Sequence, residues 1–121
     1  MSRIAAVILA AGASTRFGQC KQLLEWKGKT LLAHVTEVAL AAGLDPVIVV
    51  LGCQVEETYR ALGDRPVQKL INWHWEEGMS TSVQTGLAAV PPHADGALFL
   101  QCDQPRITAD LLRALVNRFE K

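Results

Sequence analysis

Residues 4–12 read IAAVILAAG, an apolar run that breaks on a glycine, and the chain continues as ASTRFGQCK through Lys21. An uninterrupted apolar run of this length is typical of a strand that is buried on both faces of a parallel sheet. The loop that follows holds two cationic side chains, Arg16 and Lys21, between and beyond its glycines. A buried strand that opens into a charged glycine loop therefore suggests both a fold class and a place for chemistry.

Four short apolar runs alternate with helical patterns along the rest of the chain. The predicted strands are Ile4–Leu9, Pro46–Leu51, Pro66–Ile71 and Ala94–Gln101. The predicted helices are one that Thr30 caps and Gly43 ends, one at Gln54–Leu62, one within residues 78–90 with a Thr81–Gln84 capping box, and one from Thr108 that buries Leu111, Leu112, Leu115, Val116 and Phe119. This alternation predicts a single Rossmann-like α/β domain over residues 1–121, with three α/β/α layers and a parallel sheet of order 3-2-1-4.

Composition excludes several classes of partner. Twelve Lys and Arg residues balance twelve Asp and Glu residues, so the charge gives no support for a nucleic-acid or membrane surface. No apolar stretch reaches the roughly 18–20 residues that a membrane span needs. The three cysteines, Cys20, Cys53 and Cys102, form no C-x-x-C pair, and we expect reduced thiols in a cytoplasmic protein. Any anion specificity must come from a local site.

The loop after the first strand has the chemistry of a phosphate site. In a doubly wound sheet, ligands bind beyond the carboxyl ends of the strands where the strand order reverses, here between the first and fourth strands. The loop is neither a G-x-x-x-x-G-K-[ST] nor a G-x-G-x-x-G motif. Gly12 nevertheless permits close backbone approach, Ser14 is a donor, Arg16 offers a bidentate fork and Lys21 a point charge. The plain alternative is a glycine-rich turn with solvated cations.

Asp103 follows the fourth predicted strand and faces the same crevice. A carboxylate opposite a cationic phosphate loop is the usual arrangement for a Mg²⁺ that bridges protein and substrate phosphates. The alternative is an aspartate that caps the turn before the last helix. The location of Asp103 at the reversal of strand order favours the metal.

The segment NWHWEEGMSTS, residues 72–82, follows the third predicted strand. Gly78 and the hydroxyl run of residues 80–82 at a helix start suit a nucleobase, a ribose or another phosphate, with simple N-capping as the alternative. Trp73 and Trp75 are candidates for stacking on a heterocycle, although a partly buried structural role is the commoner one for such residues.

Three motifs together resemble one known family. LAAGASTRFGQCKQLL, residues 9–24, resembles the signature LAAG-x-S-x-R-[MF]-G-x-x-K of nucleotidyltransferases that activate sugars, isoprenoid precursors and molybdopterin. Residues 72–87 and the CDQP of residues 102–105 resemble the N-x-x-W-x-x-G-M-x-x-S and D-x-P segments of the molybdenum cofactor cytidylyltransferase branch. The chain is thus similar to the MobA-like NTP transferase family.

The resemblance implies a Mg²⁺-dependent nucleotidyltransferase, in which a phosphate oxygen of the acceptor attacks the α-phosphate of a nucleoside triphosphate and pyrophosphate leaves. It implies catalytic roles for Arg16 and Lys21, which would hold the β- and γ-phosphates, and for Asp103, which would carry the metal. The Ala-Ala-Gly form of the loop favours CTP as donor, with a molybdopterin-type phosphate as acceptor. The implied nucleotide contacts are Leu9, Ala10, Ala11, Gly12, Ser14, Arg16, Lys21, Asn72, Gly78, Met79, Ser80 and Ser82.

Family members carry further strands with acceptor-side residues and a second acidic metal ligand. The resemblance therefore implies that this chain is the N-terminal, nucleotide-binding portion, C-terminally truncated relative to the family. Two alternatives stay open: a nucleotidyltransferase for a sugar phosphate or isoprenoid precursor, and a non-catalytic nucleotide- or partner-binding module that serves a molybdoenzyme. An oligomer that covers the edge of the four-stranded sheet also stays open.

Overall fold

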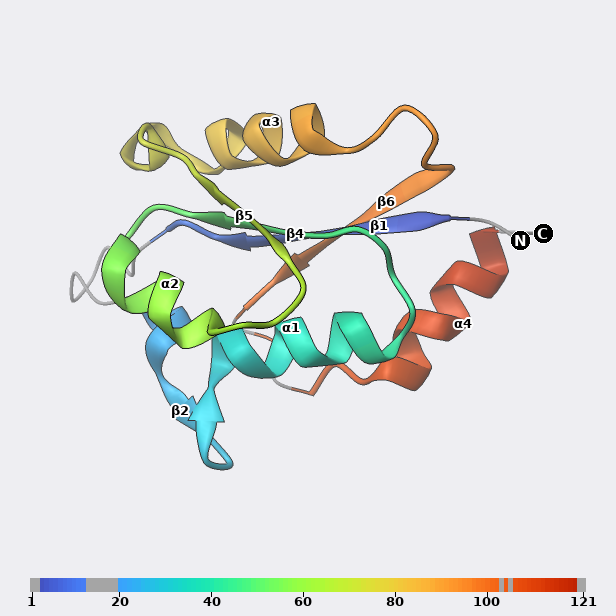
Figure 1. The fold of residues 1–121 in the computed structure, drawn as a ribbon, viewed down its shortest axis with the longest axis horizontal. Helices are drawn as coiled ribbons and strands as arrows, with labels where there is room; N and C mark the ends of the chain where they lie inside the picture. Colours follow the sequence, from blue (N-terminus) through green and yellow to red (C-terminus); the bar gives the residue numbers. More distant parts are fainter. Residues whose placement is uncertain (1–2, 13–19, 103, 105, 120–121) are drawn as a thin grey trace.

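A four-stranded parallel sheet runs through the middle of the computed structural model, which describes residues 3–12, 20–102, 104 and 106–119 (Figure 1). Its strand order is β5-β4-β1-β6, which confirms the predicted order 3-2-1-4. Strand β1 pairs with β4 along one edge and with β6 along the other. The strands are β1 (Ile4–Ala10), β4 (Val47–Leu51), β5 (Gln68–Ile71) and β6 (Gly96–Gln101).

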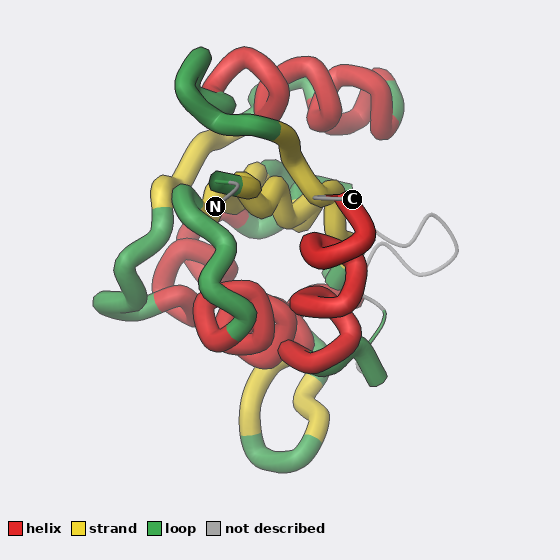
Figure 2. Tube along the Cα trace, turned by 90° about the vertical axis from the view of Figure 1, so that its right-hand side faces the viewer, coloured by secondary structure: helices red, strands yellow, loops and turns green. Residues whose placement is uncertain are grey.

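Helices cover both faces of this sheet. Helix α3 (Met79–Ala89) lies over one face, and α1 (Leu31–Ala41), α2 (Val55–Leu62) and α4 (Ala109–Phe119) lie on the other (Figures 1 and 2). The side chains of β1 serve the two layers alternately: Ile8 joins the core beneath α1, whereas Val7 joins the core on the α3 side. The predicted three-layer α/β/α class is confirmed. Among the described residues, no helix is both long and apolar enough to cross a bilayer.

Threonine hydroxyls cap the starts of α1 and α4. The Thr30 hydroxyl accepts a 3.0 Å hydrogen bond from the Ala33 N–H, as predicted. The Thr108 hydroxyl accepts one of 3.1 Å from the Leu111 N–H, at the predicted start of the last helix. The predicted Thr81–Gln84 capping box is wrong, because the N-cap of α3 is Gly78, three residues before Thr81. The Thr81 hydroxyl instead donates to the Gly78 carbonyl at 2.7 Å.

A small antiparallel hairpin, β2 (Glu25–Trp26) with β3 (Lys29–Thr30), precedes α1 and was not predicted. It projects from the bottom of the molecule in Figure 2. Lys27 and Gly28 form its turn, both with positive φ (53° and 84°), as a two-residue hairpin turn requires. Two-residue strands are too short to show alternation, which is why sequence periodicity does not reveal them.

An ion-pair cluster fixes this hairpin to the helical layer. Glu37 of α1 accepts from the Lys29 ammonium at 2.5 Å and from the Arg65 guanidinium at 2.6 Å. The hydrogen bonds from Lys29 and Arg65 lower the pKa of the Glu37 carboxyl below its ordinary value of 4.5. Glu37 therefore connects β3, α1 and the turn before β5.

Helix α4 buries less of its apolar face than predicted. Leu112 is fully buried and Val116 is partly so, but Leu111, Leu115 and Phe119 are 49%, 41% and 55% exposed. The apolar positions of the helical pattern identified side chains that are able to pack. Among the described elements, however, α4 packs mainly against α1.

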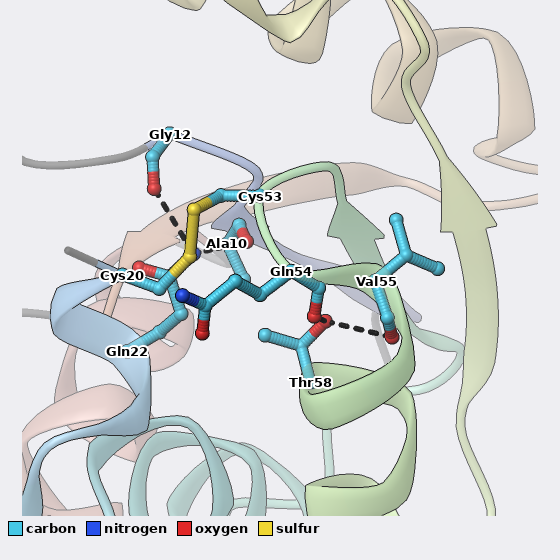
Figure 3. Close-up of a disulfide and its surroundings, with 8 residues drawn as sticks. All are labelled: Ala10, Gly12, Cys20, Gln22, Cys53, Gln54, Val55 and Thr58. Atoms are coloured by element: carbon cyan, nitrogen blue, oxygen red, sulfur yellow. Dashed lines mark hydrogen bonds between the residues drawn. A yellow bond between two sulfur atoms is a disulfide. The ribbon is translucent and has the colours of Figure 1, made fainter. Parts of the chain in front are cut away.

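The expectation of reduced thiols is wrong for two of the three cysteines. Cys20 and Cys53 form a disulfide with a Cα–Cα distance of 6.1 Å (Figure 3), whereas Cys102 lies buried outside it. The two bonded cysteines are 33 positions apart, so their spacing carried no signal. The parallel pairing of β1 with β4 brings the segments that follow these strands to the same edge of the sheet, and this places the thiols together.

The packing of α3 on the sheet predicts the effect of a side chain at Gly86. A Cβ atom there would lie 2.4 Å from Val7 Cγ1 and 3.3 Å from Val50 Cγ2, both in fully buried side chains. Helix propensity alone would make Gly86→Ala stabilising by about 1 kcal/mol. We expect the opposite sign, a destabilisation of about 1–3 kcal/mol from overpacking, measured by urea unfolding. Ala88→Gly, at an exposed position of the same helix, measures the effect of helix propensity alone. A Gly86→Ala variant more stable than the wild-type protein would contradict the predicted clash with Val7.

The disulfide predicts a large contribution to stability. In the chain-entropy model, a cross-link that closes about 33 residues stabilises the folded state by roughly 3–4 kcal/mol. The Cys20→Ser/Cys53→Ser variant should therefore unfold at a lower urea concentration than the oxidised protein, and the wild-type protein in dithiothreitol should resemble the variant. Thiol titration of the unfolded protein should find one free thiol; three would show that the bond does not form.

The Glu37 cluster predicts a pH dependence of stability. Because the folded-state pKa is lowered, the stabilisation is complete above the unfolded value near 4.5 and is lost as the pH falls through the lower folded-state pKa. Glu37→Gln should flatten the fall of the unfolding free energy below about pH 4.5, measured by urea titration at a series of pH values. Glu56→Gln, at an exposed position of α2, is the control. If the unfolding free energy falls equally with pH in both variants, Glu37 does not contribute to the pH dependence.

Candidate functional site

A hollow of about 270 Å³ lies beyond the C-terminal end of β1, between this strand and the start of α3. Ligand sites of open α/β sheets lie at this edge, so the hollow occupies the expected place. One of its walls comes from the end of β1 and the other from η2 (Trp75–Glu77) and α3. The residues that line it are Leu9, Ala11, Gly12, Trp75, Glu76, Gly78, Met79 and Ser82.

The β1 wall consists of Leu9, Ala11 and Gly12. Leu9 pairs with Gln101 of β6, Ala11 is buried, and Gly12 is exposed, with no atom of the described, non-adjacent residues within 4 Å of where its Cβ would be. A ligand can therefore approach the Gly12 backbone closely. Ala10, which was predicted to contact nucleotide, points its side chain into the core beneath α1. Ala10 is not among the residues that line the hollow.

Three successive carbonyls at this end of β1 are held by neighbouring groups; Figure 3 shows those of Ala10 and Gly12. The Gln22 side-chain amide donates to the carbonyls of Ala10 at 2.7 Å and Gly12 at 3.0 Å. The backbone N–H of Cys53 donates to the Ala11 carbonyl at 2.8 Å. The disulfide adds a covalent link between Cys53 and Cys20, which precedes Gln22 by two positions. The start of the predicted phosphate loop is thus fixed from outside the strand.

The opposite wall is built on Trp75. A Cβ on Gly52 would lie 2.7 Å from the Trp75 ring, so only glycine lets the ring pack against the end of β4. Trp75 is half-buried, whereas Trp73 is 74% exposed and lies outside the lining. Of the two tryptophans considered for stacking, Trp75 is the one that the structure brings to the hollow. Gly78, with φ of 124°, then turns the chain into α3.

Asn72, which was predicted to contact nucleotide, is buried and does not line this hollow. Its buried amide nitrogen donates to the hydroxyls of Thr81 at 2.8 Å and Ser82 at 2.9 Å, and its amide oxygen accepts from the His74 N–H at 3.0 Å. Asn72 therefore orients Ser82 at the hollow. It also lines a second, more open hollow of about 470 Å³, together with His74, Glu77, Thr81, Gln84 and Thr85.

The remaining predicted residues fall into two groups. Lys21 is exposed at the first position of η1 (Lys21–Leu23), and Ser80 is exposed at the start of α3; neither lines the two hollows. Ser14, Arg16 and Asp103 lie outside the described residues, so their predicted roles stay predictions. Within the described ranges, no three His, Cys, Asp or Glu side chains gather closely enough to hold a metal ion.

The described lining carries a carboxylate at Glu76 and no cationic side chain. Close by, His74 Nδ1 lies 2.7 Å from a Glu77 carboxylate oxygen. Binding of a triphosphate here would therefore need positive charge from outside this lining, which is the role predicted for Arg16 and Lys21.

Sequence reasoning missed Gln22, Glu76 and the disulfide as parts of this site. Gln22 carried one usable signal, since it is a polar residue that heads the apolar pair Leu23-Leu24 directly after the loop. The position of Glu76 depends on how η2 turns between β5 and α3, and this turn has no periodic pattern.

Comparison with known proteins agrees with the sequence motifs. The profile of the MobA-like NTP transferase domain matches residues 6–121. A probable molybdenum cofactor guanylyltransferase of Bacillus cereus is 28% identical over 121 residues, which is 100% of this chain and 59% of the relative. The chain thus spans a little more than half the length of this curated relative.

Solved structures show the same arrangement. Rv0371c of Mycobacterium tuberculosis is 33% identical, with a TM-score of 0.84 over 96% of this chain and 59% of its own. A second structure of Rv0371c, in complex with manganese, is 29% identical, with a TM-score of 0.78 over 96% of this chain and 59% of its own. A CMP:2-keto-3-deoxy-manno-octonic acid synthetase complexed with CTP is 28% identical, with a TM-score of 0.78 over 98% of this chain and 48% of its own.

The family resemblance of the three sequence motifs is confirmed by the profile match, which covers nearly all of the described sheet and helices. The parallel sheet of order β5-β4-β1-β6, with helices on both faces, agrees with the nucleotidyltransferase fold of the similar structures. The chain belongs to the family of MobA-like NTP transferase domains.

Proposed function

We propose that this chain binds a nucleoside triphosphate in the 270 Å³ hollow and takes part in Mg²⁺-dependent transfer of CMP from CTP to a molybdopterin-type phosphate, with release of pyrophosphate. One observation carries the proposal: the hollow lies beyond the carboxyl end of β1, where open α/β sheets bind ligands, and predicted nucleotide residues line both of its walls. These residues are Leu9, Ala11, Gly12, Gly78, Met79 and Ser82.

In this proposal the β1 wall and the charged residues beside it bind the phosphates. The backbone at Ala11 and Gly12 lies along the phosphates, and Arg16 and Lys21 neutralise the β- and γ-phosphates as pyrophosphate leaves. Asp103 carries Mg²⁺, which supplies positive charge to the reacting phosphates. The reaction needs little covalent chemistry from the protein, because positioning and charge stabilisation do most of the work in such transfers.

The donor nucleotide has two candidates. The Ala-Ala-Gly form of the loop favours CTP, and the similar synthetase complexed with CTP supports this choice. The curated relatives, in contrast, are named guanylyltransferases, which makes GTP the competing donor. The described lining offers apolar and aromatic surface from Leu9, Trp75 and Met79 that either base can contact, so a direct comparison of nucleotides must decide.

The acceptor and the catalytic competence are further parts of the proposal. A sugar phosphate or an isoprenoid precursor is the alternative acceptor, and a nucleotide-binding module without transfer activity is the alternative role. Pyrophosphate release with molybdopterin present, and none without it, would favour the first acceptor over both alternatives.

A thermal-shift panel of CTP, GTP, ATP and UTP, each with and without Mg²⁺, tests the proposed binding. A ligand at about one hundred times its Kd stabilises the folded state by about 2.7 kcal/mol, which should raise Tm by roughly 10 °C. We expect this shift with CTP in the presence of Mg²⁺ and its loss on chelation. Lys21→Ala should reduce the shift by removing a phosphate contact, whereas Arg118→Ala on α4 should leave it unchanged. No shift with any nucleotide would refute the proposal.

A further inference from the structure

Gln22 is a buried polar residue at the base of the candidate site. Its side chain is 4% exposed, and its amide nitrogen donates to two backbone carbonyls, those of Ala10 and Gly12. A glutamine amide carries two hydrogens, so both donors of Gln22 are used by these contacts. The two carbonyls belong to the last residue of β1 and to the residue two positions further along.

These contacts determine how the backbone at the end of β1 is oriented. A peptide unit is planar and trans, so its N–H lies on the edge opposite its carbonyl. When Gln22 holds the Ala10 carbonyl, it also sets the direction of the Ala11 N–H. The Cys53 N–H holds the Ala11 carbonyl in the same way, which sets the direction of the Gly12 N–H. Ala11 and Gly12 both line the hollow.

We propose that Gln22 is a positioning residue of the nucleotide site: it fixes the backbone of Ala10–Gly12 so that the N–H groups of Ala11 and Gly12 are oriented for ligand before it binds. The inference rests on the proposed function, because it concerns how that nucleotide is held. Preorganised donors bind more tightly than donors that must first be ordered, since ordering a backbone lowers its entropy on binding.

The chemistry of the site explains why an amide stands at position 22. Both partners are carbonyl oxygens, which accept hydrogen bonds, so the group between them must donate twice. The carboxylate of a glutamate only accepts and would repel both oxygens. A methionine of similar length would leave two carbonyls without these donors, and a buried polar group without a partner is unfavourable.

The test compares nucleotide affinity with stability in Gln22→Glu and Gln22→Met. We expect the Kd of Mg²⁺–CTP, or of Mg²⁺–GTP if GTP gives the larger thermal shift, to rise about tenfold or more in both variants, measured by calorimetry well below each Tm. Gln68→Glu, an exposed glutamine on β5, controls for the charge change. Leu112→Ala, in the core beneath α4, controls for lost stability and should keep the wild-type Kd.

The outcomes separate this inference from the proposed function. A folded Gln22 variant with the wild-type Kd overturns the positioning role and leaves the nucleotide site intact. Absence of binding by the wild-type protein overturns the proposed function, and the role of Gln22 with it.

A second measurement uses the wild-type protein and covers the case in which the variants do not fold. In ¹⁵N-resolved NMR, the Gln22 side-chain amide should exchange slowly with solvent, and the Ala11 and Gly12 amides should shift when Mg²⁺–nucleotide is added. A rapidly exchanging Gln22 amide, or unmoved Ala11 and Gly12 signals on binding, would overturn the inference.

Discussion

Strand β1 lies at the centre of the sheet, with hydrogen-bonded neighbours along both edges and helices over both faces. Its backbone polar groups cannot reach water, so each must find a partner within the protein. Along the strand, the pairing with β4 and β6 supplies these partners. Beyond Ala10 the ladder gives way to individual donors, the Gln22 amide and the Cys53 N–H. The hydrogen bonds that satisfy the buried backbone after β1 therefore also determine the geometry of the candidate site.

The sequence was a good guide where burial alone decides structure. The runs at Ile4–Leu9 and Pro46–Leu51 were apolar without alternation, and both became strands with nearly every side chain inaccessible. The hydroxyls of Thr30 and Thr108 also cap helices as their type suggested. In each case the information is local, or is a property of one segment that faces a common core.

The sequence was a poor guide where two distant segments must meet. Cys20 and Cys53 carry no mark of their pairing, which depends on the alignment of β1 with β4. The motif marked Asn72 as a ligand contact but carried no sign that its side-chain amide also donates to Thr81 and Ser82. The exposure of the apolar side chains of α4 depends on which elements pack against this helix, and its own sequence pattern does not reveal them.

The two walls of the hollow differ in how tightly they are tied to the core. Ala11 and its neighbours on β1 are buried and shared with the packing of the whole sheet, so substitutions there disturb folding before they alter recognition. Glu76 and Met79 on the opposite wall are exposed and carry little of the core. In the proposed nucleotide site, such a division would leave the second wall free to change its nucleobase preference at little cost to folding, whereas the first wall is constrained by the packing of the sheet.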